Sequence, residues 1–197
     1  AQNELDTRAV CRAAQIPVLE PSDSQEAKDM TKLAYEISEK YDKPVVIRTT
    51  TRLAHSQGLV ELLPLEEVED KPYEKNIAKN VMLPANAIRR HIIVEDMMEK
   101  LAKDACDMPE LNKMEIRDTK VGFITSGIPY LYVREAMPEA STLKLGMVHP
   151  LPMDLIREFA EKVDRVIVFE ELMPVIEEQV KAAGIECDGK NIFTKLR

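Results

Sequence analysis

VGFITSGIP, residues 121–129, is the stretch that decides the fold class. Its first five residues are mostly apolar and favour a buried strand, and Ser126-Gly127 indicates a turn. An amphipathic helix is expected directly afterwards, with Tyr130, Val133 and Met137 along one face. A strand, a turn and a helix in this order are typical of a parallel α/β unit.

The same alternation continues toward the C-terminus. Strands are predicted over residues 142–147 and 165–169, and a helix between them runs from about residue 153 to 163. Pro174 is placed to open a last helix and Gly184 to end it, and residues 185–187 could add a short strand. Strands separated regularly by helices predict an α/β fold with a doubly wound parallel sheet.

Another strand, helix and strand precede this unit. Residues 16–20 form a short apolar run, and a helix is expected to begin just after it, because Ser22 with Gln25, or Asp23 with Glu26, has capping-box spacing. Apolar residues then recur in steps of three and four up to Tyr41. The β-rich residues 44–50 predict a second buried strand, reached by a parallel crossover.

Between the two units the sequence changes character. Prolines and the acidic run over residues 66–70 indicate a connector. Within it, residues 94–105 have helical periodicity. The chain therefore divides into a first unit over residues 1–63, a connector with one amphipathic helix over 64–119, and a second unit over 120–197.

The composition describes an ordinary soluble globular protein. The 197 residues carry a formal net charge of -8, which disfavours nucleic acid and anionic membranes as partners. No apolar run approaches the ~18 residues of a membrane helix. No signal peptide is recognisable, and Ala1 is not a start methionine, so we expect a cytoplasmic protein whose given sequence begins at an internal boundary.

The cysteines give the same indication of the compartment. Cys11, Cys106 and Cys187 are far apart and form no C-x-x-C pair. This pattern argues for a reducing compartment and against a zinc or iron–sulfur site in this chain. Small, buried or half-buried apolar side chains are the simplest interpretation of all three.

The strongest candidate for chemistry is RTTTRLAHS, residues 48–56. It follows a predicted parallel strand, and open α/β sheets bind ligands beyond the carboxyl ends of their strands. Arg52 could hold a carboxylate or phosphate through two hydrogen bonds, and His55 could donate a hydrogen bond or transfer a proton. The alternative is a solvated arginine and a surface histidine.

Two other strand ends carry weaker signals. Backbone N–H groups at Ser126-Gly127 could bind an anion, or the turn could simply need a small residue. No Gly-rich phosphate-binding motif accompanies this turn. Glu170-Glu171 could face a ligand or another subunit, or complement the dipole of the helix that follows.

Several stretches, in the same order along the chain, resemble the α subunits of indolepyruvate:ferredoxin oxidoreductases. The match covers nearly the whole chain apart from the connector, and it rests on residues 2–8, 16–29, 48–56, 124–127, 144–152 and 170–172. The resemblance implies that residues 1–63 are the C-terminal part of a thiamine pyrimidine-binding domain. It also implies that residues 120–197 form a transketolase C-terminal-like domain.

The resemblance further implies an oxidoreductase that decarboxylates aryl 2-oxoacids such as indolepyruvate to acyl-CoA, with ferredoxin as electron acceptor. The whole enzyme would use coenzyme A, thiamine diphosphate, Mg²⁺ and 4Fe–4S clusters, and would include a β subunit. The family motifs for these cofactors do not occur in this sequence, so we expect the segment alone to bind no cofactor or metal and to be inactive. The residues expected near the substrate side of the cofactor are Gln2, Asn3, Arg52, His55 and Ser56.

Other functions remain open at this point. The segment could serve mainly as a structural module for subunit association, because incomplete sheets leave edges that favour self-association. It could also be the same segment of a pyruvate or 2-oxoglutarate oxidoreductase. The residues do not determine which 2-oxoacid is preferred, or whether coenzyme A contacts this segment.

Overall fold

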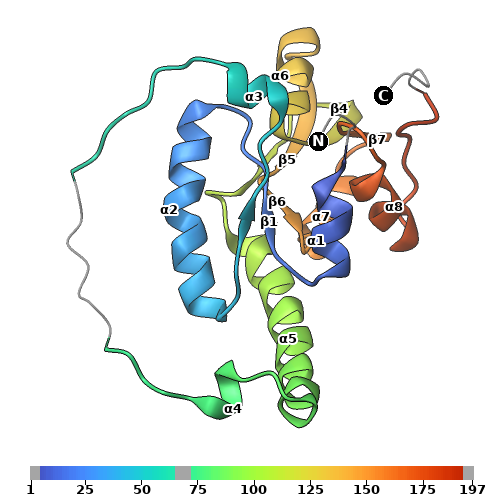
Figure 1. Cartoon of the computed structure of the whole chain (residues 1–197). Helices are drawn as coiled ribbons and strands as arrows, with labels where there is room; N and C mark the ends of the chain where they lie inside the picture. The colour runs from blue at the N-terminus through green and yellow to red at the C-terminus, as the bar shows by residue number, and fades with distance from the viewer. Residues whose placement is uncertain (1–4, 65–71, 193–197) are drawn as a thin grey trace.

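The computed structural model describes residues 5–64 and 72–192 (Figure 1). The first part contains α1 (Thr7–Ala13), β1 (Val18–Leu19), α2 (Ser24–Tyr41), β2 (Val46–Ile47) and α3 (Thr51–His55). The middle contains α4 (Ile77–Asn80), α5 (Pro84–Asp104), the 3-10 turn η1 (Ala105–Asp107) and β3 (Asn112–Glu115). The last part contains β4 (Asp118–Ser126), α6 (Gly127–Ala136), β5 (Ala140–Leu145), β6 (Met147–His149), α7 (Met153–Ala160), β7 (Val166–Phe169) and α8 (Val175–Ala182).

The larger of two sheets has the strand order β3-β5-β4-β7. The strand β4 lies inside it and pairs in parallel with β5 and β7, so that Ile124 lies between Leu143 and Val168. These side chains are buried, as expected for parallel strands with helices nearby. The strand β3 pairs antiparallel with β5 at the edge. The predicted α/β class is confirmed, and the antiparallel edge makes the sheet mixed rather than wholly parallel.

The smaller sheet has the order β2-β1-β6, and it joins two strands of the first part of the chain to one strand of the last part. The strands β1 and β2 are parallel, as predicted, whereas β6 runs antiparallel to β1. The predicted strand over 142–147 therefore divides at Gly146 into two strands of different sheets. A Cβ atom at Gly146 would lie 2.4 Å from the Leu111 carbonyl oxygen, so only glycine fits there without a backbone shift.

The smaller sheet separates two apolar cores. Val18 and Val148 belong to the larger core, whereas Leu19 and Met147 belong to the other. Successive strand residues point to opposite faces, so two short strands contribute to both cores. The second core is completed by α2 and the C-terminal half of α5, through Met30, Ala34, Ile37, Tyr41, Leu101 and Ala105.

The structure confirms the helix that was predicted after residue 22, which is α2. Asp23 is the N-cap residue, and its side chain accepts a hydrogen bond from the Glu26 backbone N–H at 2.8 Å. The predicted apolar stripe is buried at Met30, Ala34, Ile37 and Tyr41. Within the described ranges, no helix combines the length and the apolar composition that crossing a membrane requires.

Some boundaries differ from the sequence predictions. The expected strand over 44–50 shortens to Val46–Ile47, and α3 begins directly afterwards with Thr50 as its cap. The strand expected at 185–187 is wrong, because the pairing there is a single bridge between Ile167 and Asp188. The helix α1 was not predicted, since its seven residues are too few to show a clear apolar periodicity.

His149, in β6, is a buried histidine without a hydrogen-bond partner for either ring nitrogen in the described structure. Burial lowers the pKa of His149 to about 4, and the positive charges of Arg12 and Lys43 act in the same direction. Its ordinary pKa is 6.5. Between these two values the unfolded chain binds more protons than the folded one, so stability rises with pH there and is lost on acidification.

We expect His149→Phe to remove this pH dependence. The substitution keeps a flat apolar body in the same buried position and cannot take up a proton. The wild-type protein should lose about 2–3 kcal/mol more stability than the variant when the pH falls from ~7 to ~4.5. Urea unfolding at several pH values measures this difference. Parallel pH profiles for the two proteins would contradict the burial of a neutral histidine.

Candidate functional site at the carboxyl ends of the strands

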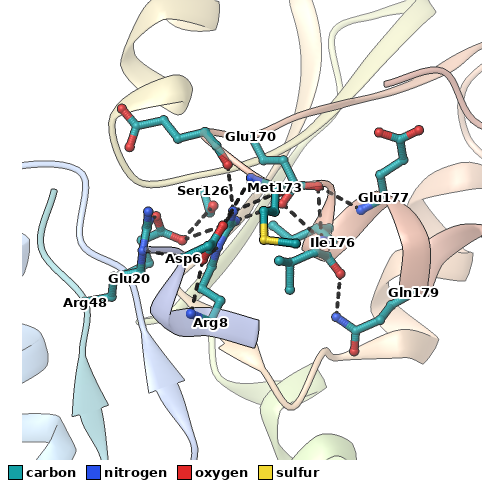
Figure 2. Close-up of polar contacts among 12 residues, drawn as sticks. Asp6, Arg8, Glu20, Arg48, Ser126, Glu170, Met173, Ile176, Glu177 and Gln179 are labelled. Carbon is teal, nitrogen blue, oxygen red and sulfur yellow. Dashed lines mark hydrogen bonds and ion pairs between the residues drawn. The ribbon is translucent and has the colours of Figure 1, made fainter. Parts of the chain in front are cut away.

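Polar side chains from four strands converge at their carboxyl ends (Figure 2). Glu20 follows β1, Arg48 follows β2, Ser126 ends β4 and Glu170 follows β7. Each is at most 7% exposed. Buried charges require charged partners and hydrogen bonds, so these residues form one network rather than four separate contacts.

The guanidinium of Arg8 lies at the centre of this network, and it is fully buried. Its Nε and Nη2 donate to both oxygens of Asp6 at 2.9 and 2.6 Å, while Nη1 donates to Glu170 Oε2 at 2.8 Å. Nη2 also donates to the carbonyl oxygens of Glu171 and Met173 at 2.7 and 3.1 Å. Arg8 thereby ties α1 to the loop between β7 and α8.

Glu20 connects the two halves of the network. It accepts a hydrogen bond from Arg48 Nη1 on one oxygen and from Ser126 Oγ on the other, the latter at 3.0 Å. Arg8 Nη1 also lies 3.9 Å from Glu20 Oε2. One carboxylate thus joins the ends of β1, β2 and β4.

Glu170 caps the N-terminus of α8. Its carboxylate accepts hydrogen bonds from the backbone N–H groups of Ile176 and Glu177 at 2.9–3.0 Å. Burial raises the pKa of Glu170, and Arg8 and these N–H groups offset the effect only in part. Burial alone would also raise the pKa of Asp6, but Arg8 and Arg48 outweigh it and lower that pKa.

The predicted residues of α3 lie outside this buried network. Arg52, His55 and Ser56 are all exposed. The Arg52 guanidinium lies over the Tyr132 ring, 5.4 Å from its centroid, and its charge acts on the half-buried Glu171. The Ser56 hydroxyl donates to the Leu53 carbonyl, whereas His55 has no ion pair or hydrogen bond in the described part of the chain. Gln2 and Asn3 fall outside the described residues.

The turn at Ser126-Gly127 contacts an anion that belongs to the chain itself. The Glu20 carboxylate accepts from Ser126 Oγ, and a Cβ atom at Gly127 would lie 3.1 Å from Glu20 Oε1. Gly127 also has a φ of 55°, which favours glycine. The need for a small residue is therefore explained, while binding of an external anion at this turn stays a prediction.

Sequence reasoning missed Arg8 and Glu20 as parts of the site. Arg8 lies in a charged segment that gives no strand or helix signal of its own. Glu20 directly follows the shortest kind of strand, two residues long. Only Glu20 carries a positional signal, because a charged residue directly after an apolar run that forms a parallel strand ends up at the carboxyl edge of the sheet.

The sequence model of the indolepyruvate oxidoreductase domain matches residues 112–192. Over its whole length the chain is 42% identical to the indolepyruvate oxidoreductase subunit IorA of Pyrococcus abyssi (strain GE5 / Orsay), and it covers 33% of that subunit. It is 39% identical to IorA of Archaeoglobus fulgidus, over 94% of the chain and 30% of the subunit. The 2-oxoglutarate synthase subunit KorA of the same organism is 25% identical over 79% of the chain and 49% of that subunit.

Among solved structures, the fold resembles a 2-oxoglutarate:ferredoxin oxidoreductase from Magnetococcus marinus with 2-oxoglutarate, coenzyme A and succinyl-CoA bound. The TM-score is 0.63 at 18% identity, covering 88% of this chain and 38% of that chain. The architecture is thus one found in 2-oxoacid oxidoreductases. Residues 112–192 thus match the indolepyruvate oxidoreductase domain, and the chain as a whole is similar to IorA subunits, of which it spans about a third of the length.

We expect Arg8→Leu to destabilise the protein by about 3–5 kcal/mol, because it leaves buried carboxylates without their counter-charge. The control is Arg165→Leu. The Arg165 side chain is 54% exposed, and its substitution breaks an ion pair with Asp188. That change should cost at most about 1 kcal/mol. Chemical unfolding of both variants measures the difference, and equal losses would show that Arg8 does not organise the network.

Proposed function

We propose that this chain is a segment of a subunit that oxidatively decarboxylates aryl 2-oxoacids of the indolepyruvate kind to acyl-CoA, with ferredoxin as electron acceptor. The observation that carries the proposal is the 42% identity to IorA over the whole chain. The 25% identity to KorA covers less of the chain and supports a 2-oxoglutarate preference less well. The segment on its own is proposed to be inactive.

In this proposal the buried network is a scaffold, and Arg52 is the group that meets a ligand. Its guanidinium is exposed and lies against the Tyr132 ring, which leaves its planar edge free to bind a carboxylate or phosphate. Those groups occur in the 2-oxoacid and in coenzyme A. His55 and Ser56, on the same short segment, and Gln2 and Asn3 are proposed neighbours of the substrate.

Thiamine diphosphate, Mg²⁺ and the 4Fe–4S clusters are proposed to be held by other parts of the enzyme. Among the described residues, no group of three or more His, Cys, Asp and Glu side chains is placed to hold a metal ion. The buried carboxylates Asp6, Glu20 and Glu170 are already bonded to arginines and backbone N–H groups. These residues therefore do not fit a resident metal. A β subunit, ferredoxin and a cytoplasmic location complete the proposal.

Assembly is the second function that a specific observation favours. Large apolar side chains are exposed along α5, including Ile88 and Ile92. Such a surface is typical of a contact between protein chains. A role in subunit association is compatible with a role in the enzyme, since the two surfaces lie on different elements.

The substrate proposal is tested with the full-length enzyme and its β subunit. We expect kcat/KM for indolepyruvate to exceed that for pyruvate and for 2-oxoglutarate by at least ~10-fold, which corresponds to about 1.4 kcal/mol of transition-state discrimination. Ferredoxin reduction is the readout, and reactions without coenzyme A are the control. A preference for 2-oxoglutarate or pyruvate would overturn the aryl assignment.

The role of Arg52 is tested in the same full-length enzyme. We expect Arg52→Ala to lower kcat/KM about 10- to 100-fold, because a charge-assisted pair of hydrogen bonds is lost, and Arg52→Lys to recover part of it. Arg134→Ala is the control, since Arg134 is on the same helix as Tyr132 but pairs with Glu115. Separate KM values for the 2-oxoacid and coenzyme A identify the ligand. Unchanged kcat and KM would remove Arg52 from the site.

A further inference from the structure

The N-terminal half of α5 extends away from the body of the molecule. Figure 1 shows this helix, in light green, projecting past α2 toward α4. Its buried side chains, Met98 and Leu101, both lie in the C-terminal half. The other half exposes large apolar residues, with Ile88 69%, Ile92 60% and Ile93 40% accessible.

These exposed residues form one stripe on the outer face of the helix. Ile88 and Ile92 are four positions apart, and Arg89 and Asp96 are seven apart, so all four lie along the same side. The opposite side faces the protein, where Arg90 Nη2 donates to Asp42 at 3.0 Å. Val81, Met82 and Leu83, which are 44–59% exposed, continue the apolar surface just before the helix. A continuous apolar stripe indicates a contact surface, whereas single exposed apolar residues do not.

Charge along this stripe reverses from basic to acidic. On the outer face Arg89 lies before the middle of α5, Asp96 and Glu99 lie after it, and Lys103 follows in the last turn. Arg89 and Asp96 form no ion pair with any residue in the ranges that the structure describes, and both are exposed. A second α5 placed antiparallel would bring Arg89 of each copy near Asp96 of the other.

We propose that the outer face of α5 binds the same face of a second copy of this chain, antiparallel and about a two-fold axis near Ile92. Ile92 then packs on Ile92 of the partner subunit, and Arg89 lies beside Asp96 of the partner subunit. A parallel arrangement would oppose like charges, so the sequence of α5 selects the antiparallel one. A surface that complements itself in this way is the kind that a two-fold dimer requires.

The size of the surface sets the expected strength. Stable dimers bury about 1,200–2,000 Å² in total, which is more than the two half-helices alone provide. The apolar residues Ile77, Val81, Met82 and Leu83 lie next to α5 in the chain and extend the contact. We therefore expect a dimer with a dissociation constant on the order of micromolar.

Analytical ultracentrifugation of the 197-residue chain tests the proposal through a charge exchange. Arg89→Glu alone and Asp96→Arg alone each place like charges at both symmetry-related contacts, and each should weaken dimerisation at least tenfold. An equimolar mixture of the two variants restores both opposite-charge pairs and should dimerise nearly as well as the wild type. The double variant should do the same. Tyr35→Glu, at a residue on α2 that is 74% exposed, is the control and should change nothing.

Circular dichroism distinguishes a loss of dimerisation from a loss of folding. Every variant should retain the wild-type spectrum. A wild-type chain that stays monomeric at a concentration of several hundred micromolar would overturn the proposal. Single variants that dimerise like the wild type, or a mixture that fails to recover, would overturn it too. The proposal does not depend on the substrate or on Arg52, so failure of the enzymatic assignment leaves it intact.

Discussion

The ion pairs of Arg8 are the interaction on which the rest of this structure depends. A fully buried guanidinium is costly to remove from water, and it is tolerated only when most of its N–H groups are satisfied. Arg8 meets this condition with Asp6, Glu170 and two backbone carbonyl groups. Because these partners come from both ends of the chain, the first helix and the last strand can adopt only a narrow range of relative positions.

This constraint also determines which groups remain for a ligand. The buried carboxylates at the strand ends already have arginine partners. Arg48, for example, is bonded to Glu20. Arg52 is different, since it comes four residues after the buried Arg48 and is exposed to solvent over an aromatic ring. The carboxyl edge of the sheet therefore has a buried inner layer, which positions the elements, and an exposed outer layer with Arg52, where we propose that a ligand binds.

The sequence predicts those parts of the fold that depend on local periodicity. The stripe of α2 and the parallel strands β4, β5 and β7 follow from apolar spacing alone. The division at Gly146 could not be predicted, because it depends on the Leu111 carbonyl group, which is distant in sequence. The core position of Arg8 could not be predicted either, since local composition favours a charged residue on the surface.

The position of α5 follows from contacts at its anchored end. Leu101 and Ala105 are completely buried there, and the side-chain amide of Asn112 donates to the Ala105 carbonyl at 2.8 Å. The amide oxygen of Asn112 accepts from the backbone N–H groups of Gly146 and Met147 at 3.1 and 3.2 Å. One side chain thus joins the end of α5 to the point where the chain passes from one sheet to the other. This attachment belongs to the second core, whereas the proposed ligand-binding edge is supported by the network of Arg8. A change at either surface therefore leaves the support of the other in place.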